Sequence, residues 1–260
     1  MRTVIIFAIC SLALLTSCQK PHSTTTQAIS IDSTLDAIQD TVYLHRLAPT
    51  KAVVDKEMNV KIGYIPETMW VGSPECPILN WLTDALWNAA KKVYPGRVDM
   101  ALVNMGSVRC EWLPGDLTFG QIYQVMPFEN QLVVLTLSGK DIIDLYASFA
   151  QIGAQGVAGV RMTIVDGQLA DLTIGGKPVN PKKDYTLATS DYLTGGADGL
   201  VALTRYKKLW NSELPIRDLY IQEAQEQDTI RAAVDGRFEI LNLIFDILCG
   251  HWLYPAVVPA

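Results

Sequence analysis

The sequence predicts an α+β domain, with strands and helices mixed along the chain, over residues 48–241. Three observations support this fold class. Short β-rich segments alternate with segments of helical periodicity. Turn-forming Gly, Pro and Asp residues separate these segments. Hydrophobic residues make up 49% of the chain, which is enough to form a sizeable core. No internal repeat divides the region further, so we expect one domain.

Residues 1–17 are predicted to be a lipoprotein signal peptide. Arg2 provides a positive start, and the apolar segment Val4–Leu15 is too short to span a membrane. The sequence Leu15-Thr16-Ser17-Cys18 resembles a lipobox, the bacterial signal in which the cysteine is acylated. We therefore expect lipidation of Cys18 and a lipid anchor in the bacterial cell envelope, at the outer membrane or periplasmic face. The alternative is an ordinary secretory signal in which Cys18 occurs by chance.

A polar segment follows, and residues 18–47 are predicted to be a tether. Within it, Leu35–Leu47 is either a short helix or a continuation of the linker. From Ala48 the composition changes, and Lys51–Met58 favours a helix. Val60–Tyr64 then favours a strand.

The next elements carry stronger signals. Pro77 stands where the first turn of a helix tolerates proline, and Ile78–Val93 places its apolar residues at helical spacing. Val98–Val103 is typical of a buried strand, as is the β-rich segment Gln131–Leu137. Ser138-Gly139 begins a helix that is expected to continue to Gln151.

The C-terminal half of the domain is predicted mainly from turns. Val160–Val165 and Leu169–Ile174 flank Asp166-Gly167, a strong hairpin signal. The remaining expected elements are a turn at 175–178, a strand at 185–190 that leads into a glycine-rich loop, a helix at 215–225 and a strand at 237–241. Residues 242–260 form an apolar tail that is too interrupted to span a membrane. Packing on the domain, partner binding and disorder all remain open for it.

Composition excludes several functions. The net charge is −6 and the basic residues are scattered, which argues against a nucleic-acid partner but still allows one bound phosphate. A binuclear phosphoesterase needs several His and Asp ligands, whereas this chain has only His22, His45 and His251, widely spaced. No motif of a zinc protease, a serine hydrolase or a P-loop occurs. We therefore predict no catalytic residue, metal site or cofactor in this chain.

The cysteines point to neither zinc nor a disulfide framework. Beyond the predicted signal and Cys18, only Cys76, Cys110 and Cys249 remain, an odd number without CxxC spacing. One pair could bond in an oxidising compartment, and the sequence does not indicate which.

Three loops contain residues suited to holding a ligand. Asn104–Arg109 follows a buried strand and combines small residues with a forked cation, although a tight turn with a surface arginine has the same pattern. Phe128 is either a stacking platform or a core residue. The loop 191–199 contains Tyr192 and Asp198, and its alternative is a solvated turn with the ring packed on the core. Two aromatic rings on separate loops could enclose a nucleobase.

Six elements occur in a fixed order along the chain: Pro74-Glu75-Cys76-Pro77-Ile78-Leu79-Asn80-Trp81-Leu82-Thr83-Asp84, Asn104–Arg109, Gly115–Asn130, Leu137-Ser138-Gly139, Gly176-Lys177-Pro178-Val179 and Thr189–Gly199. Together they resemble the C-terminal, substrate-binding domain of the 5′-nucleotidase family. The resemblance covers about residues 48–241 and implies a mixed sheet with flanking helices. Ser107, Cys76 and Ser190 depart from the family pattern.

The resemblance also implies roles for individual residues. Phe128 and Tyr192 would enclose the base, and Asn130 would bond the base edge. Asp198 would bond the ribose hydroxyls, and Arg109 would face the phosphate or the adjoining end of the nucleotide. Gly153 would line the base pocket.

In the family a metallophosphoesterase domain precedes this one and carries the metals. The tether after Cys18 is too short to hold such a domain, so we expect divalent metals only in a separate catalytic partner. The chain would then recognise nucleotides or nucleosides within a split 5′-nucleotidase that acts in nucleotide catabolism outside the cytoplasm. The alternative is a non-catalytic binding or adhesion lipoprotein without a nucleotide site.

Overall fold

The computed structural model describes residues 40–242, so the predicted signal peptide, Cys18 and the tail 243–260 lie outside the described residues. The chain divides into two compact units between Pro49 and Thr50. Helix α2 (Thr41–Met58) has no buried residue. Of the two interpretations left open for Leu35–Leu47, the helical one therefore holds from Thr41 onward. The predicted domain boundary at residues 47/48 stays a prediction.

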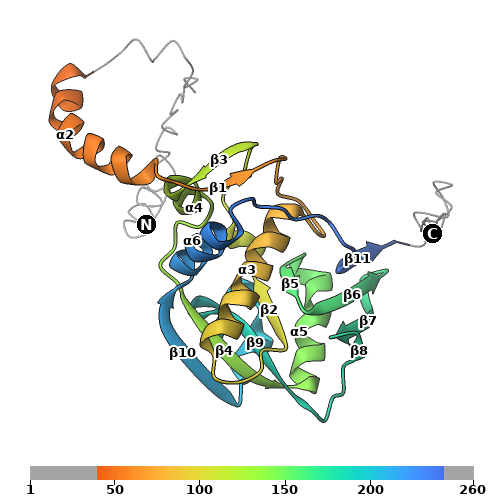
Figure 1. The fold of residues 1–260 in the computed structure, drawn as a ribbon. Helices are drawn as coiled ribbons and strands as arrows, with labels where there is room; N and C mark the ends of the chain where they lie inside the picture. Colours follow the sequence, from red (N-terminus) through yellow and green to blue (C-terminus); the bar gives the residue numbers. More distant parts are fainter. Residues whose placement is uncertain (1–39, 243–260) are drawn as a thin grey trace, which may run out of the picture. The chain divides into compact units, whose positions relative to one another are not determined.

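A five-stranded mixed sheet forms the centre of the second unit (Figure 1). Strand β4 pairs antiparallel with both β9 and β10, whereas β2 pairs parallel with β9 and antiparallel with β5. The α+β prediction with a mixed sheet is therefore confirmed. In spatial order the strands are β10 (Lys208–Pro215), β4 (Gln131–Ser138), β9 (Asp184–Ser190), β2 (Met100–Val103) and β5 (Gly156–Ala158).

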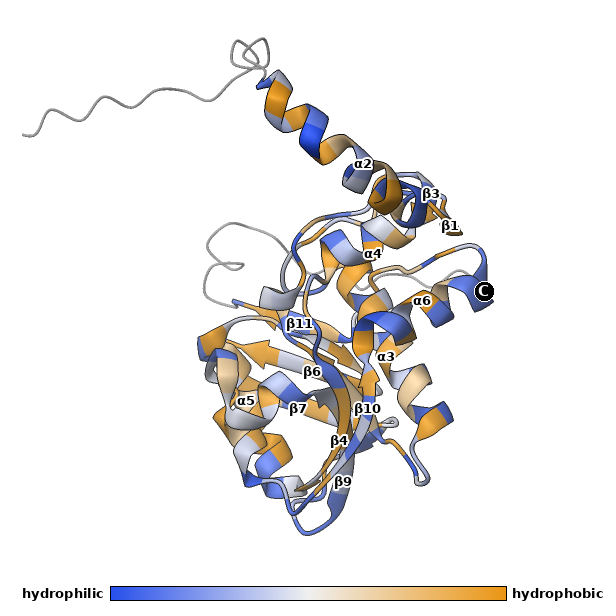
Figure 2. Ribbon diagram, turned by 90° about the vertical axis from the view of Figure 1, so that its left-hand side faces the viewer, coloured by the Kyte–Doolittle hydropathy of each residue, from blue (hydrophilic) through white to orange (hydrophobic). Residues whose placement is uncertain are grey.

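Helices lie on both faces of this sheet, with α5 on one side of the strands and α3 on the other (Figure 2). Helix α3 (Pro77–Val93) packs with α6 (Ile216–Gln227) on the face that presents Val134. Helix α5 (Gly139–Ile152) packs on the face that presents Val133 and Leu135. Because successive side chains of a strand point to opposite faces, β4 must be apolar at consecutive positions to serve both cores.

Two smaller sheets complete the described fold. Strands β6 (Val160–Val165) and β7 (Gln168–Ile174) form the predicted hairpin, with positive φ angles at Asp166 and Gly167 that this tight turn requires. Strand β8 (Lys177–Pro178) pairs with β7, and β11 (Phe238–Leu241) pairs parallel with β6. Strands β1 (Lys61–Ile65) and β3 (Gly115–Thr118) form a separate antiparallel pair.

Strands β3, β5 and β10 and helix α4 were not predicted. Strand β10 is an edge strand in which polar and apolar side chains are both exposed and none is fully buried, so it lacks the apolar alternation by which strands are recognised. Helix α4 (Phe119–Val125) is short, but it begins at a capping box in which Thr118 and Gln121 bond each other's backbone. That pair is visible in the sequence and was missed.

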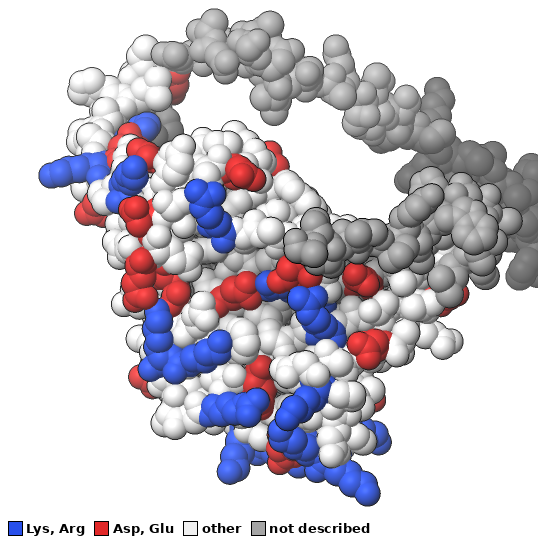
Figure 3. Space-filling view, turned by 45° about the vertical axis from the view of Figure 1, so that its right-hand side comes forward, with Lys and Arg blue, Asp and Glu red and all other residues white. Residues whose placement is uncertain are grey.

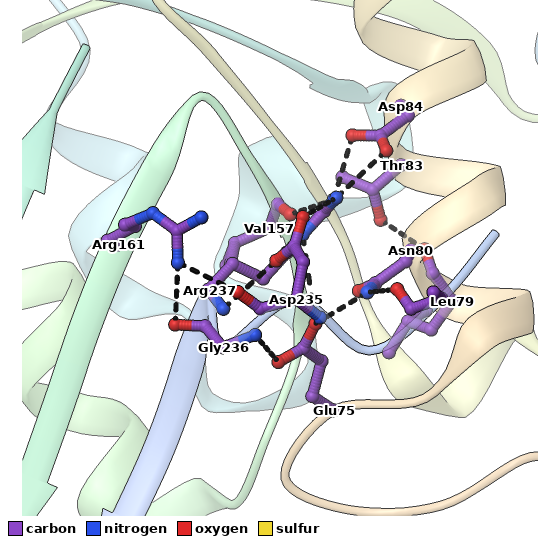
Figure 4. Close-up of polar contacts among 11 residues, drawn as sticks. Glu75, Leu79, Asn80, Thr83, Asp84, Val157, Arg161, Asp235, Gly236 and Arg237 are labelled. Atoms are coloured by element: carbon purple, nitrogen blue, oxygen red, sulfur yellow. Dashed lines mark hydrogen bonds and ion pairs between the residues drawn. The ribbon is translucent and has the colours of Figure 1, made fainter. Parts of the chain in front are cut away.

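A buried carboxylate fixes the segment that leads into β11 (Figure 4). Glu75 accepts hydrogen bonds from Asn80 Nδ2 at 2.6 Å, Asp235 N at 2.8 Å and Gly236 N at 3.1 Å. Next to it, Arg237 binds both carboxylate oxygens of Asp84, at 2.8 and 3.0 Å, and Asp235 at 2.8 Å. These hydrogen bonds from Arg237 hold the pKa of the Asp235 carboxyl below its ordinary value. The loop before α3 is thus joined to the end of the domain.

Charged side chains of both signs are interspersed on the face shown in Figure 3. Lys and Arg side chains are more frequent in the lower part of this view than in its upper part. Within residues 40–242, no helix combines the length and apolar character needed to cross a membrane.

Candidate functional site

The predicted ligand loops meet at one edge of the five-stranded sheet. Strands β2 and β9 are parallel, so the loops that follow them emerge at the same edge. Strand β4 runs antiparallel to β9, and residues 128–130 therefore enter β4 at that edge as well. The first loop forms the 3-10 turn η2 (Met105–Ser107), and the loop after β9 forms η3 (Asp191–Gly195) and η4 (Ala197–Gly199).

These loops enclose a cavity of about 360 Å³, a size typical of small-molecule sites. Five of the six predicted binding residues line this cavity, although they come from three separate segments. Arg109 is the one base and Asp198 the one acid among the lining residues. The lining residues are Asn104, Gly106, Ser107, Arg109, Phe128, Asn130, Tyr192 and Asp198.

Gly153 is not among the lining residues. It ends α5 with φ 89°, a conformation that favours glycine, and a Cβ there would meet no atom within 4 Å. Its carbonyl accepts a bond from Gln155 Nε2 at 3.3 Å, and Gln155 Oε1 accepts from the amide of Met105 at 2.9 Å. Gly153 is thus connected to the η2 loop through a buried glutamine. No sequence signal had singled out Gln155.

Three side chains form a connected polar group in the cavity. Asn104 Nδ2 donates to Asp198 Oδ2, and the Tyr192 hydroxyl donates to Asp198 Oδ1 at 3.3 Å. The charge of Asp198, followed by this hydrogen bond, raises the pKa of Tyr192. Tyr192 is 51% exposed, so the alternative in which its ring packs on the core is wrong.

The aromatic and cationic walls of the cavity are also in contact. The guanidinium carbon of Arg109 lies 5.0 Å from the centre of the Phe128 ring, within the range of a cation–π interaction. The Arg109 amide donates to Val125 O at 3.0 Å, which holds its backbone beside the segment that leads to Phe128. Phe128 is partly buried: one part of its side chain packs on the hydrophobic core, and another part lines the cavity. It is therefore both a core residue and a possible stacking platform.

Two larger hollows occur in the described region, of about 510 and 630 Å³. Both are more open to solvent than the cavity at the sheet edge, and neither contains a predicted site residue. Within residues 40–242, no group of three or more His, Cys, Asp or Glu side chains is arranged to hold a metal ion. Cys76 and Cys110 are free thiols, and Cys249 lies outside the described residues.

The fold and the cavity define a class of protein: an α+β domain with a small-molecule site at the edge of a mixed sheet. The chain belongs to the family of 5′-nucleotidase C-terminal domains, whose model matches residues 61–205. The resemblance inferred from the sequence motifs is therefore confirmed at the level of the family.

Curated relatives agree with this assignment. The protein UshA of Escherichia coli is 30% identical over 138 residues, which cover 50% of this chain and 25% of UshA. A 5′-nucleotidase of Vibrio vulnificus is 27% identical over 185 residues, or 68% of this chain and 32% of that protein. This chain thus spans a quarter to a third of the length of these relatives.

Solved structures share the fold. A 5′-nucleotidase precursor from Thermus thermophilus superposes with a TM-score of 0.70 at 20% identity, covering 78% of this chain and 44% of that one. The NAD nucleotidase of Haemophilus influenzae gives a TM-score of 0.62 at 20% identity, covering 84% of this chain and 43% of that one. At such identities the agreement establishes the fold alone.

Proposed function

We propose that the chain binds nucleosides and nucleotides in the cavity at the sheet edge and recognises the substrate for a 5′-nucleotidase. The observation that carries this proposal is that Arg109, Phe128, Asn130, Tyr192 and Asp198 line one cavity. These residues come from three segments of the chain, and the first and last of them are 89 positions apart. The order of the strands in the sheet brings them together.

The chemistry of the lining residues suits a nucleotide. Phe128 and Tyr192 offer aromatic faces, and stacking one base contributes about 1–3 kcal/mol. Asn130 can both donate to and accept from a base edge. Asp198 accepts hydroxyl hydrogens of a sugar, and Arg109 offers a forked cation to a phosphate.

Hydrolysis is assigned in this proposal to a separate metallophosphoesterase. Phosphoester hydrolysis of that kind uses two metal ions to activate water and to neutralise the phosphate. The chain would supply base and sugar recognition, and its partner would supply the metals. Lipidation of Cys18 would keep the complex at the cell envelope, where salvage of external nucleotides takes place.

Titration calorimetry of the purified full chain with adenosine and AMP tests the binding role. Because only part of a complete active site holds the ligand, we expect a Kd of roughly 10 µM to 1 mM. Tyr192→Ala should weaken binding by about tenfold or more, whereas Tyr192→Phe should retain most of it because the ring remains. Tyr206→Ala, an exposed tyrosine outside the cavity, is the matched control.

Equal affinity in wild type and Tyr192→Ala would reject the nucleotide site and favour the binding or adhesion alternative. The partner is tested separately by phosphate release from AMP. We expect none from this chain with Mn²⁺, Zn²⁺ or Co²⁺, and release when a metallophosphoesterase without its own C-terminal domain is added. Release by the chain and metal alone, abolished by a chelator, would contradict the split arrangement.

A further inference from the structure

The larger of the two open hollows, of about 630 Å³, lies between the segment that follows β1 and the segment that joins α6 to β11. Hydrogen bonds fix both of its walls. Met69 exchanges two backbone hydrogen bonds with Trp112, at 2.8 and 3.1 Å, and Asn80 Nδ2 donates to Ala233 O at 2.9 Å. The hollow is therefore part of the folded domain, and it shares no lining residue with the cavity at the sheet edge.

Large apolar side chains on both walls of this hollow are exposed. Trp70 is 41% exposed on one wall, and Val234 is 51% exposed on the other. Gly72 allows the Trp70 ring to lie where it does, because a Cβ on Gly72 would be 2.5 Å from Cζ3 of that ring. Single exposed apolar residues are ordinary, but apolar side chains that share one hollow indicate a surface that binds another segment or molecule.

The backbone beside these side chains is also available. The segment that joins α6 to β11 meets β1 at one isolated bridge, between Thr229 and Tyr64. Beyond this bridge, the amides of residues 231–234 donate no hydrogen bond to any residue within the described range 40–242. Unpaired amides next to exposed apolar side chains suit an extended peptide, which brings both backbone carbonyls and side chains.

The apolar tail of the chain has the matching character. Thirteen of the eighteen residues at 243–260 are apolar. From Trp252 onward none is charged, so this part of the tail can enter an apolar hollow without burying a charge.

The tail is also long enough to reach the hollow. It begins two residues after β11 ends, and Asn242 is eight residues after Val234. An extended chain spans at most about 3.6 Å per residue, so the return from Asn242 to Val234 is at most about 29 Å. The eight residues 243–250 can cover that distance. Trp252 and Tyr254 are then the first aromatic residues available to the hollow.

We propose that Trp252-Leu253-Tyr254 docks into this hollow of the same chain, with its two rings against Trp70 and Val234. Alternate residues of an extended segment point to the same side, so Trp252 and Tyr254 can enter together. A segment tethered this closely has an effective concentration in the millimolar range, which favours it over a free partner or a second copy. The tail would thus cover apolar surface of its own domain. This inference does not depend on the proposed nucleotide-binding function.

Hydrogen–deuterium exchange of the full chain tests the docking. Exchange of the amides of residues 231–234 should be about tenfold or more slower in wild type than in Trp252→Asp, which places a charge in the hollow. Ala260→Asp adds the same charge to the tail outside the docked segment and should keep the protection. Dilution of the protein should not change the protection, because the contact lies within one chain.

Trp70→Ala is the reciprocal variant, because it changes the hollow and leaves the tail intact. Chymotrypsin should cleave after Trp252 about tenfold faster in Trp70→Ala than in wild type, since the docked segment is released. Val201→Ala is the matched control, because Val201 is an exposed apolar residue that does not line the hollow, and its cleavage rate should equal that of wild type. If Trp252→Asp fails to fold, the cleavage rate of Trp70→Ala decides alone.

Three results would overturn the inference. Fast exchange at residues 231–234 in wild type, unchanged by Trp252→Asp, would mean that the tail does not occupy the hollow. Protection that is lost on dilution would assign the hollow to a second copy of the chain. Protection that appears only after a metallophosphoesterase is added would assign it to that partner.

Discussion

Replacement of the buried Glu75 carboxylate should strongly lower the free energy of unfolding, although Glu75 does not line the cavity. Glu75 accepts three hydrogen bonds, from Asn80 Nδ2 and from the amides of Asp235 and Gly236. It also lies 3.9 Å from Arg237 Nε. The carboxylate therefore satisfies two backbone amides that connect α6 to β11.

The magnitude follows from the number of groups left unpaired. In Glu75→Gln, one of the two carboxylate oxygens becomes an NH₂ group, which cannot accept a hydrogen bond. At least one of the donors then loses its acceptor, which costs about 1–3 kcal/mol when buried. Glu75→Ala removes every acceptor and leaves Arg237 with fewer partners, so about 3–5 kcal/mol is expected. That is a large fraction of the stability of a typical domain, about 5–15 kcal/mol.

Urea unfolding followed by circular dichroism measures both variants. Glu67→Gln is the matched control, because Glu67 is exposed and its free energy of unfolding should change by less than about 0.5 kcal/mol. The reasoning is refuted if Glu75→Gln behaves like Glu67→Gln. A destabilised Glu75→Gln that still binds adenosine normally when folded would confirm that this network serves stability and not recognition.

Three further predictions concern other parts of the chain. The buried Tyr220 hydroxyl has no hydrogen-bond partner among residues 40–242, so Tyr220→Phe should raise the free energy of unfolding by about 1 kcal/mol in urea titration. Burial raises the pKa of Tyr146, so the folded state keeps a proton that the unfolded chain releases near pH 10. The free energy of unfolding should therefore fall above about pH 10, and it should fall less steeply in Tyr146→Phe. Cys18→Ala should move the protein from the membrane fraction to the soluble fraction, and retention after salt washing would place the anchor elsewhere.

The sequence predicted the elements whose apolar pattern is set by burial. Helix α3 and the β6–β7 hairpin were predicted because one has helical periodicity and the other a turn with a defined backbone requirement. Strand β10 was missed because an edge strand needs no apolar face, and β5 because three residues are too few for a pattern. Both strands are recognised only by their partners in the sheet.

In the candidate site, too, some residues were predicted from the sequence and others were not. Motif order identified Phe128, Tyr192 and Asp198, and the sheet topology explains why their loops converge. The hydrogen bond from the Met105 amide of the η2 loop to Gln155 Oε1 joins residues 50 apart, and no pattern in the sequence around Gln155 predicts it. Long-range hydrogen bonds of this kind depend on where helices end in space, which local patterns do not encode.

The parallel pairing of β11 with β6 has a consequence for synthesis. Strand β6 ends at Val165, but its partner begins only at Phe238 and is among the last described segments to leave the ribosome. Until then β6 is an open sheet edge, and the carboxylate of Glu75 has no backbone amides to bind. Contacts between such distant segments form slowly, and the incomplete chain is prone to aggregate. The nascent domain should therefore depend on chaperones until residue 241 emerges, and a stop codon just before Asp235 should be more damaging than deletion of α2.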